Sequence, residues 1–65
     1  MYIREQRKKL NLTQIKLAQL MNVDQTAISQ WETGRTKPTL DNLVLLSKIL
    51  KCDLESLIND TSNNK

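Results

Sequence analysis

The 65-residue sequence predicts a compact all-α domain of five short helices. Leucine and isoleucine recur at spacings of three and four residues, which is the period of a helix with one buried face. Strict alternation of apolar and polar residues is absent, and so are the Asn-Gly and Asp-Gly pairs typical of β-hairpins. A chain of this length is expected to form one domain, because two separate cores would each be too small to fold unaided.

The first helix is expected over about residues 2–10, with Ile3 and Leu10 toward the core. After a short connector, Thr13 is a good N-cap for the second helix. That helix is expected to end near Asn22, which tolerates the left-handed conformation of a tight turn. Its buried side chains are expected to be Leu17, Ala18 and Met21.

The third helix is expected to begin after Asp24, whose carboxylate suits both an N-cap and the helix dipole. It is expected to bury Ile28 and Trp31 and to end at Gly34, a typical C-terminal cap. A loop follows, because Pro38 disfavours a helical conformation at the residue before it.

Thr39 and Asp53 are the expected N-caps of the fourth helix and of a short fifth helix. The side chains expected to be buried on these helices are Leu40, Leu43, Leu46, Ser47, Leu50, Leu54, Leu57 and Ile58. We therefore expect a single domain over residues 1–59 and a disordered tail formed by the polar residues 60–65.

Several classes of chemistry are poorly supported by the composition. The chain has one cysteine and no histidine, which argues against an internal disulfide, a zinc site and a nucleophilic triad. Cys52 is interpreted as a packed apolar residue without a functional role. With no paired carboxylates and no glycine-rich phosphate loop, we expect no enzyme activity, cofactor or metal.

The apolar pattern also predicts no membrane segment. The longest apolar run covers residues 43–46, far short of the roughly 20 residues that a spanning helix needs. The basic N-terminal stretch has no apolar segment behind it, unlike a secretory signal. A cytoplasmic location is therefore expected.

Charge is distributed unevenly along the chain. Residues 1–39 contain seven basic and three acidic side chains, a net charge of +4, whereas residues 40–65 contain three and four, a net charge of −1. This asymmetry suits a domain with one face against a polyanion. A basic run such as residues 7–9 is more often simply a solvated helix surface, so charge alone is weak support for a polyanion partner.

The predicted second and third helices are joined by a turn of three residues, 22–24. So short a turn forces a steep crossing, and the small Ala18 allows the close approach that the crossing needs. Such a helix-turn-helix unit usually places its second helix, here 25–33, in the DNA major groove. On a helical wheel Thr26, Ser29, Gln30 and Thr33 point outward, and Gln25 flanks them at the N-terminal end. The candidates for base contact are Gln25, Thr26, Ser29 and Gln30. A solvated surface helix is the alternative for this face.

Backbone contacts are predicted on both sides of that helix. The positive charge of Lys16 lies in the first turn of the second helix, where it interacts unfavourably with the helix dipole. A phosphate bound by Lys16 and Gln14 at this helix end would explain its position. An exposed lysine without a role is the alternative. After the third helix, phosphate contact is expected from Arg35, Thr36 and Lys37.

Glu32 falls in the inward stripe of the third helix, where an unpaired carboxylate is costly. It therefore needs a cation, and Arg7 of the first helix is the predicted partner. The pair would have a structural role.

Taken together, these residues resemble the lambda-repressor/Cro-like helix-turn-helix domains, also called the Xre family. The likeness covers about residues 3–59 and depends above all on Leu17-Ala18 and on the spacing of Glu32, Gly34 and Pro38. It implies a five-helix fold, operator binding as a dimer and transcriptional regulation. At matching positions it implies DNA contact at Gln14, Gln25, Thr26, Ser29, Gln30, Arg35 and Lys37, and the Arg7–Glu32 pair.

The expected function is that of a sequence-specific DNA-binding regulator, a dimeric repressor that places helix 25–33 in the major groove of a palindromic operator. Phage repressors, restriction-modification controllers and antitoxins are not separated by the sequence. The alternative is a protein-interaction module or antitoxin-type protein. Its candidate partner face, or equally a homodimer seam, is the apolar pair Leu45 and Ile49, expected on the outward side of the fourth helix, with Ile15 as a further partner contact.

Overall fold

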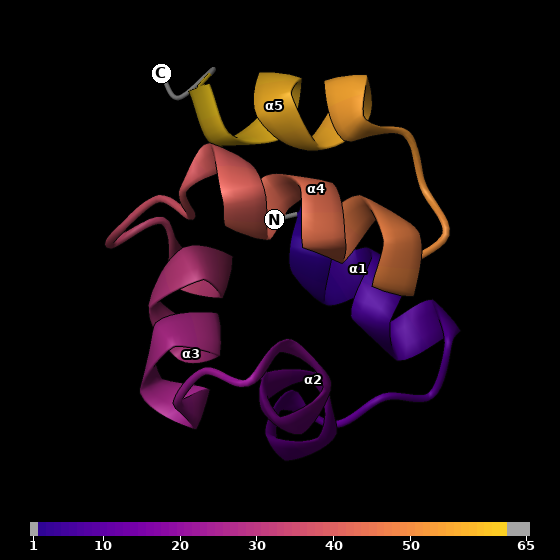
Figure 1. Ribbon diagram of the computed structural model, residues 1–65, viewed down its shortest axis with the longest axis vertical. Helices are drawn as coiled ribbons and strands as arrows, with labels where there is room; N and C mark the ends of the chain where they lie inside the picture. Colours follow the sequence, from indigo (N-terminus) through magenta and orange to yellow (C-terminus); the bar gives the residue numbers. More distant parts are fainter. Residues whose placement is uncertain (1, 63–65) are drawn as a thin grey trace.

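The computed structural model describes residues 2–62 of the chain, with side chains described for residues 2–59. This part contains five helices and no strand, which confirms the predicted all-α class. The helices are α1 (Tyr2–Lys9), α2 (Gln14–Met21), α3 (Gln25–Thr33), α4 (Leu40–Ile49) and α5 (Leu54–Ser62). In Figure 1, α4 lies in front of α1, and α5 runs beside α4 in the opposite direction.

The α2–α3 pair has the geometry expected of the short turn. In Figure 1, α2 is seen almost end-on while α3 lies across the view, so the two helices cross steeply. Asn22 ends α2 in the left-handed conformation, at φ 59° and ψ 44°. Its backbone N–H closes the helix by donating to the carbonyls of Ala18 and Gln19. The predicted helix-turn-helix arrangement is present.

Hydroxyl side chains cap two of the helices as predicted. Thr13 Oγ1 accepts from the backbone N–H of Lys16, and Thr39 Oγ1 accepts from that of Asn42. Asp24 occupies the N-cap position of α3 with the extended backbone that the position requires, but its side chain makes no capping hydrogen bond. The expected cap bond is therefore absent. Asp24 is exposed, so water can hydrate its carboxylate and the free N–H groups alike.

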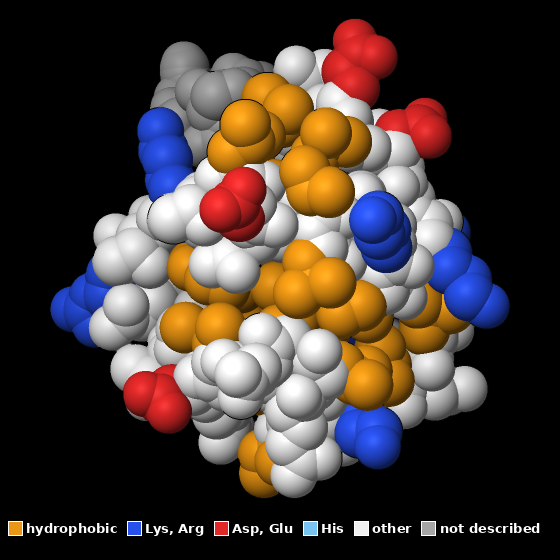
Figure 2. Space-filling model, in the orientation of Figure 1, with side chains coloured by type: hydrophobic (Ala, Val, Ile, Leu, Met, Phe, Trp, Pro, Cys, Tyr) orange, Lys and Arg blue, Asp and Glu red, His pale blue; other side chains and the backbone are white. Residues whose placement is uncertain are grey.

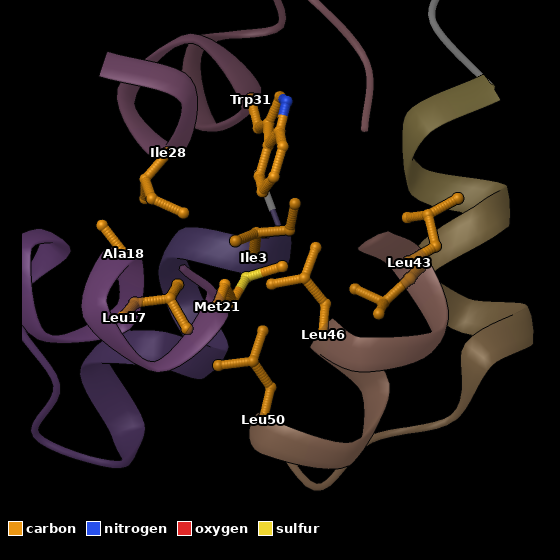
Figure 3. Close-up of a cluster of buried hydrophobic side chains, with 10 residues drawn as sticks. Ile3, Leu17, Ala18, Met21, Ile28, Trp31, Leu43, Leu46 and Leu50 are labelled. Carbon is orange, nitrogen blue, oxygen red and sulfur yellow. The ribbon is translucent and has the colours of Figure 1, made fainter. Parts of the chain in front are cut away.

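The core lies where α1, α2, α3 and α4 converge. Figure 3 shows the side chains of Ile3, Met21 and Leu46 meeting between three helices, while the ring of Trp31 reaches toward them from α3. Among the described side chains, the buried hydrophobic residues of this core are Ile3, Leu17, Ala18, Met21, Ile28, Trp31, Leu43, Leu46, Leu50 and Leu57. Cys52 is partly buried against this cluster, and its pKa is raised by burial and by the charge of Asp53.

Two of the residues that were expected to be buried, Leu40 and Ile58, are exposed instead. Leu40 was expected to be buried, but it is 62% exposed, because no element packs over the first turn of α4 on that side. Ile58 was expected to face inward, but it is 36% exposed. Successive helical residues point about 100° apart, so Ile58 cannot share the inward direction of its fully buried neighbour Leu57.

The pair Leu45 and Ile49 also differs from expectation. Both were expected on the outward side of α4, but both are partly buried and pack against the core cluster. They are therefore not a fully exposed apolar seam.

Helix α5 is longer than the sequence predicted. Its backbone continues through residues 60–62, which were assigned to a disordered tail, while residues 63–65 of that tail lie outside the described part. An established helix adds one hydrogen bond per further residue and needs no apolar side chain at each step. Within the described residues, no helix has both the length and the apolar character needed to cross a bilayer.

Candidate nucleic-acid interface

The candidate interface consists of α3, the N-terminus of α2 and the loop after α3. On α3, Gln25 and Thr26 are exposed, whereas Ser29 and Gln30 are partly buried. Thr26 and Gln30 lie away from the buried face formed by Ile28, Trp31 and Glu32, whereas Gln25 borders that face at the N-terminal end of the helix. The amide and hydroxyl groups of these four residues remain candidates for base contact.

The amide of Gln25 is held by a chain of hydrogen bonds. Gln25 Nε2 donates to Gln14 Oε1 at 3.2 Å, and Gln14 Nε2 donates to Glu32 Oε1 at 3.0 Å. Glu32 in turn accepts from Arg7. The chain therefore connects an exposed side chain on α3 to a buried ion pair, and it passes through the first residue of α2.

The Arg7–Glu32 ion pair is present as the sequence predicted. Arg7 Nε donates to Glu32 Oε2 at 2.6 Å and Arg7 Nη2 donates to Glu32 Oε1 at 3.1 Å, a two-point contact. Arg7 Nη1 also donates to the carbonyl of Leu12 at 2.8 Å. Both side chains are buried, at 9% and 3% exposure, so α1, α3 and the connector before α2 are joined inside the molecule.

The Glu32 carboxylate stays charged in this environment. Burial raises its pKa, but hydrogen bonds from Arg7 and Gln14 and the positive charges of Arg7 and Arg4 outweigh that effect. The net result is a pKa below the ordinary value of 4.5. A charged carboxylate accepts from Gln14 more strongly than a protonated one, and this favours a single orientation of the Gln14 amide.

A second small network lies at the C-terminal end of α3. Thr36 Oγ1 donates to Gln30 Oε1 at 3.4 Å, so the loop side chain contacts the helix side chain. Thr33 Oγ1 donates to backbone carbonyls of Ser29 and Gln30 at 3.1 and 3.2 Å. Gly34 then ends α3 at φ 80°, in the left-handed conformation that its position was expected to require.

Three cations surround α3 without covering it. Lys16, Arg35 and Lys37 are all exposed, and the structure shows none of them in an ion pair with another described residue. Lys16 lies in the first turn of α2, whereas Arg35 and Lys37 belong to the loop that follows α3. Exposed cations can contact phosphate groups, and the amide and hydroxyl side chains of α3 can bond to base edges. This combination suits a nucleic acid.

Sequence reasoning missed the bonds that Gln14 makes to Gln25 and Glu32. Gln14 was expected to contact a phosphate, and the structure shows it partly buried with two protein partners. A signal was available, because Gln14 and Gln25 are each the first residue of a helix of the steeply crossing pair. The crossing angle that brings the two amides together is nevertheless a tertiary property.

Comparison with known proteins agrees with this geometry. Residues 3–57 match the protein family described as helix-turn-helix. Repressor protein C2 of Salmonella phage P22 is 45% identical over 56 residues, which are 86% of this chain and 26% of that protein. The HTH-type transcriptional regulator DicA of Escherichia coli is 46% identical over 50 residues, 77% of this chain and 37% of that protein. The HTH-type transcriptional activator BcrR of Enterococcus faecalis is 40% identical over 48 residues, 74% of this chain and 24% of that protein.

The chain thus spans about a quarter to somewhat over a third of the length of these relatives. No solved structure matches it at a significant level. The match of residues 3–57, together with the steep α2–α3 crossing and the left-handed cap at Gly34, leads to one conclusion. This chain belongs to the lambda-repressor/Cro-like helix-turn-helix family.

Proposed function

We propose that this chain binds duplex DNA in a sequence-specific manner and regulates transcription by occupying promoter DNA as a repressor. The observation that supports this best is the restrained amide of the exposed Gln25 at the N-terminal end of α3. The family membership and the relatives described as repressors and transcriptional regulators favour the same function.

The bonding of Gln25 favours adenine as its target. One Nε2 hydrogen is used on Gln14, which leaves the second Nε2 hydrogen and Oε1 available. Adenine offers N7 as an acceptor and N6 as a donor in the major groove, and a glutamine amide pairs with both at once. Gln14 fixes the amide in advance, so less side-chain entropy is lost on binding. Thr26, Ser29 and Gln30 supply the remaining base contacts in this proposal.

Phosphate contacts set the position of α3 in the groove. Lys16 and the remaining Nε2 hydrogen of Gln14 lie at the N-terminus of α2, a helix end that favours an anion. Arg35, Thr36 and Lys37 contact the backbone on the other side of the reading helix. These contacts raise affinity for all sequences alike and make it dependent on salt.

Two copies are proposed to bind one palindromic operator. The structure measures 28 × 22 × 20 Å. Successive major grooves on one side of DNA are about 34 Å apart, so one copy, with one reading helix, reaches only one of them. Two copies related by a two-fold axis would read two inverted half-sites.

Selection of binding sites from a random duplex pool tests this proposal, followed by titration of the selected site and a scrambled site at two salt concentrations. We expect an enriched inverted repeat that is bound tightly and with a steep salt dependence. No enrichment, with weak binding to every sequence, would reject the proposal and favour the protein-interaction alternative.

Substitutions separate base reading from backbone contact. Gln25→Ala is expected to weaken the selected site by about 1–3 kcal/mol and to relax preference at one base pair. Lys37→Ala is expected to weaken all sequences equally and to reduce the salt slope by about one. Equal losses on selected and scrambled DNA for Gln25→Ala would reject the base-reading role.

A further inference from the structure

The outer side of α4 has a stripe that the DNA interface does not use. Asp41, Val44, Leu45 and Lys48 are spaced at i, i+3, i+4 and i+7, so they form one face of the helix. Asp41 and Lys48 are exposed, and Val44 and Leu45 are partly exposed between them. Figure 2 shows hydrophobic side chains gathered over α4 and α5 on this side of the molecule, with acidic and basic side chains beside them.

Among the residues whose side chains are described, neither charge of the stripe has a partner. The structure shows neither Asp41 nor Lys48 in an ion pair or side-chain hydrogen bond with another described residue. They lie seven residues apart, which is about 10 Å along a helix and too far for a direct contact with each other. Each end of α4 therefore presents one unpaired charge, negative near the N-terminus and positive near the C-terminus.

This charge order is self-complementary under a two-fold rotation. In an antiparallel pair of α4 helices whose axis passes between Val44 and Leu45, Asp41 of each copy faces Lys48 of the other. A two-fold interface requires this reciprocity, because contact of residue i with residue j implies contact of j with i. The partly exposed Val44 and Leu45 of both copies then meet at the axis and lose contact with water.

We propose that α4 is the dimerisation surface of this protein, and that a second copy of the chain packs against it in antiparallel orientation through the Asp41–Lys48 stripe. The proposal deepens the two-copy arrangement proposed above by naming its interface. Only two apolar side chains lie at the centre of the stripe, so the buried area is at the low end for specific interfaces. The free dimer is therefore weak, and a shared operator strengthens it by holding two copies together.

Charge reversal tests this interface in the absence of DNA, by analytical ultracentrifugation over a range of protein concentrations. In Asp41→Lys, two attractive pairs become two repulsive ones, and Lys48→Asp has the same effect with opposite charge. Each single variant is expected to raise the dissociation constant of the dimer by about tenfold or more. The double variant Asp41→Lys/Lys48→Asp is expected to dimerise like the wild type.

An equimolar mixture of the two single variants gives the sharpest result. Both cross-pairs are attractive in the mixed dimer, so dimers are expected to return although neither variant forms them alone. This recovery between two chains cannot arise from the interaction of Asp41 or Lys48 with the dipole of its own helix. Circular dichroism melting checks that each variant folds. Glu5→Lys, an exposed position on α1 with the same charge change as Asp41→Lys, is the control expected to leave dimerisation unchanged.

A wild-type chain that stays monomeric at millimolar concentration would overturn the proposal, and so would a dimer that neither charge reversal affects. Either result leaves the DNA-binding proposal standing, because site selection measures base preference of α3 whether or not α4 pairs. Conversely, a dimer that behaves as described and selects no DNA sequence would support the α4 interface and reject the proposed function.

Discussion

At the scale of single residues, the buried pair of Arg7 and Glu32 has the largest effect on the molecule. It joins α1 to α3, and Gln14 extends it to the exposed Gln25. The two charges are buried together. Removing either partner would leave the other charge buried without compensation, which destabilises the fold. Stability and the proposed base reading by Gln25 are thus connected through a single carboxylate.

Glu32→Ala is expected to lower the free energy of unfolding by about 3–5 kcal/mol, because it leaves the Arg7 guanidinium buried without a counter-charge. Urea unfolding followed by circular dichroism measures the loss. Glu5→Ala, which removes an exposed carboxylate, is the matched control and is expected to change stability by less than about 0.5 kcal/mol. An unchanged urea midpoint for Glu32→Ala would contradict the importance of the pair.

The lowered pKa of Glu32 predicts that the stability of the fold decreases as the pH falls. The unfolded chain has the ordinary pKa near 4.5 and the folded chain a lower one. The contribution of Glu32 is therefore complete above the unfolded pKa and is lost as the pH falls through the folded pKa. Wild-type protein should lose more stability than Glu32→Gln between about pH 6 and pH 3, as measured by urea midpoints. Parallel curves for the two proteins would argue against this linkage.

At the scale of elements, caps and turns were the most predictable features. Thr13, Thr39, Asn22 and Gly34 all take the positions expected of them, because capping depends on a few neighbouring backbone groups. Burial was less predictable, as exposed Leu40 shows, since it depends on which other element lies opposite. The boundary of α5 was missed because an established helix can continue through polar residues, which the apolar pattern does not reveal.

Gly34→Ala tests the turn after α3. A Cβ atom added at this position meets nothing within 4 Å, so the cost comes from the backbone angle of φ 80° and not from a clash. A loss of about 1–2 kcal/mol is expected in urea unfolding. Gly34→Asn is expected to cost less, because asparagine tolerates the left-handed conformation. Equal stability of the alanine variant and the wild type would show that the turn relaxes.

At the scale of the whole molecule, the described part has a core of ten buried apolar residues that joins all five helices. Six of them have no exposed surface: Ile3, Leu17, Ile28, Leu46, Leu50 and Leu57. The position of α3 relative to α2 depends on this shared core. Changes far from the candidate interface are therefore expected to act on stability first.

Leu46→Ala is expected to destabilise the fold by about 2–5 kcal/mol, because it opens a cavity where α1, α2 and α4 meet. Ile15→Ala is the control on the surface: Ile15 is 55% exposed, and its truncation should cost far less. Thermal melting of both variants measures the difference. Similar melting temperatures would contradict the central position assigned to Leu46.

Residue type and spacing were sufficient to predict the helical class, the α2–α3 turn, most of the core and the partnership of Arg7 with Glu32. These features follow from the apolar period, the capping residues and the need of a buried carboxylate for a cation. Packing between helices was needed to establish that Gln14 joins Glu32 to Gln25, that Leu40 is exposed and that Leu45 and Ile49 pack against the core. Those outcomes depend on the crossing angles between helices, which are set by the packing of the whole core and not by any local pattern.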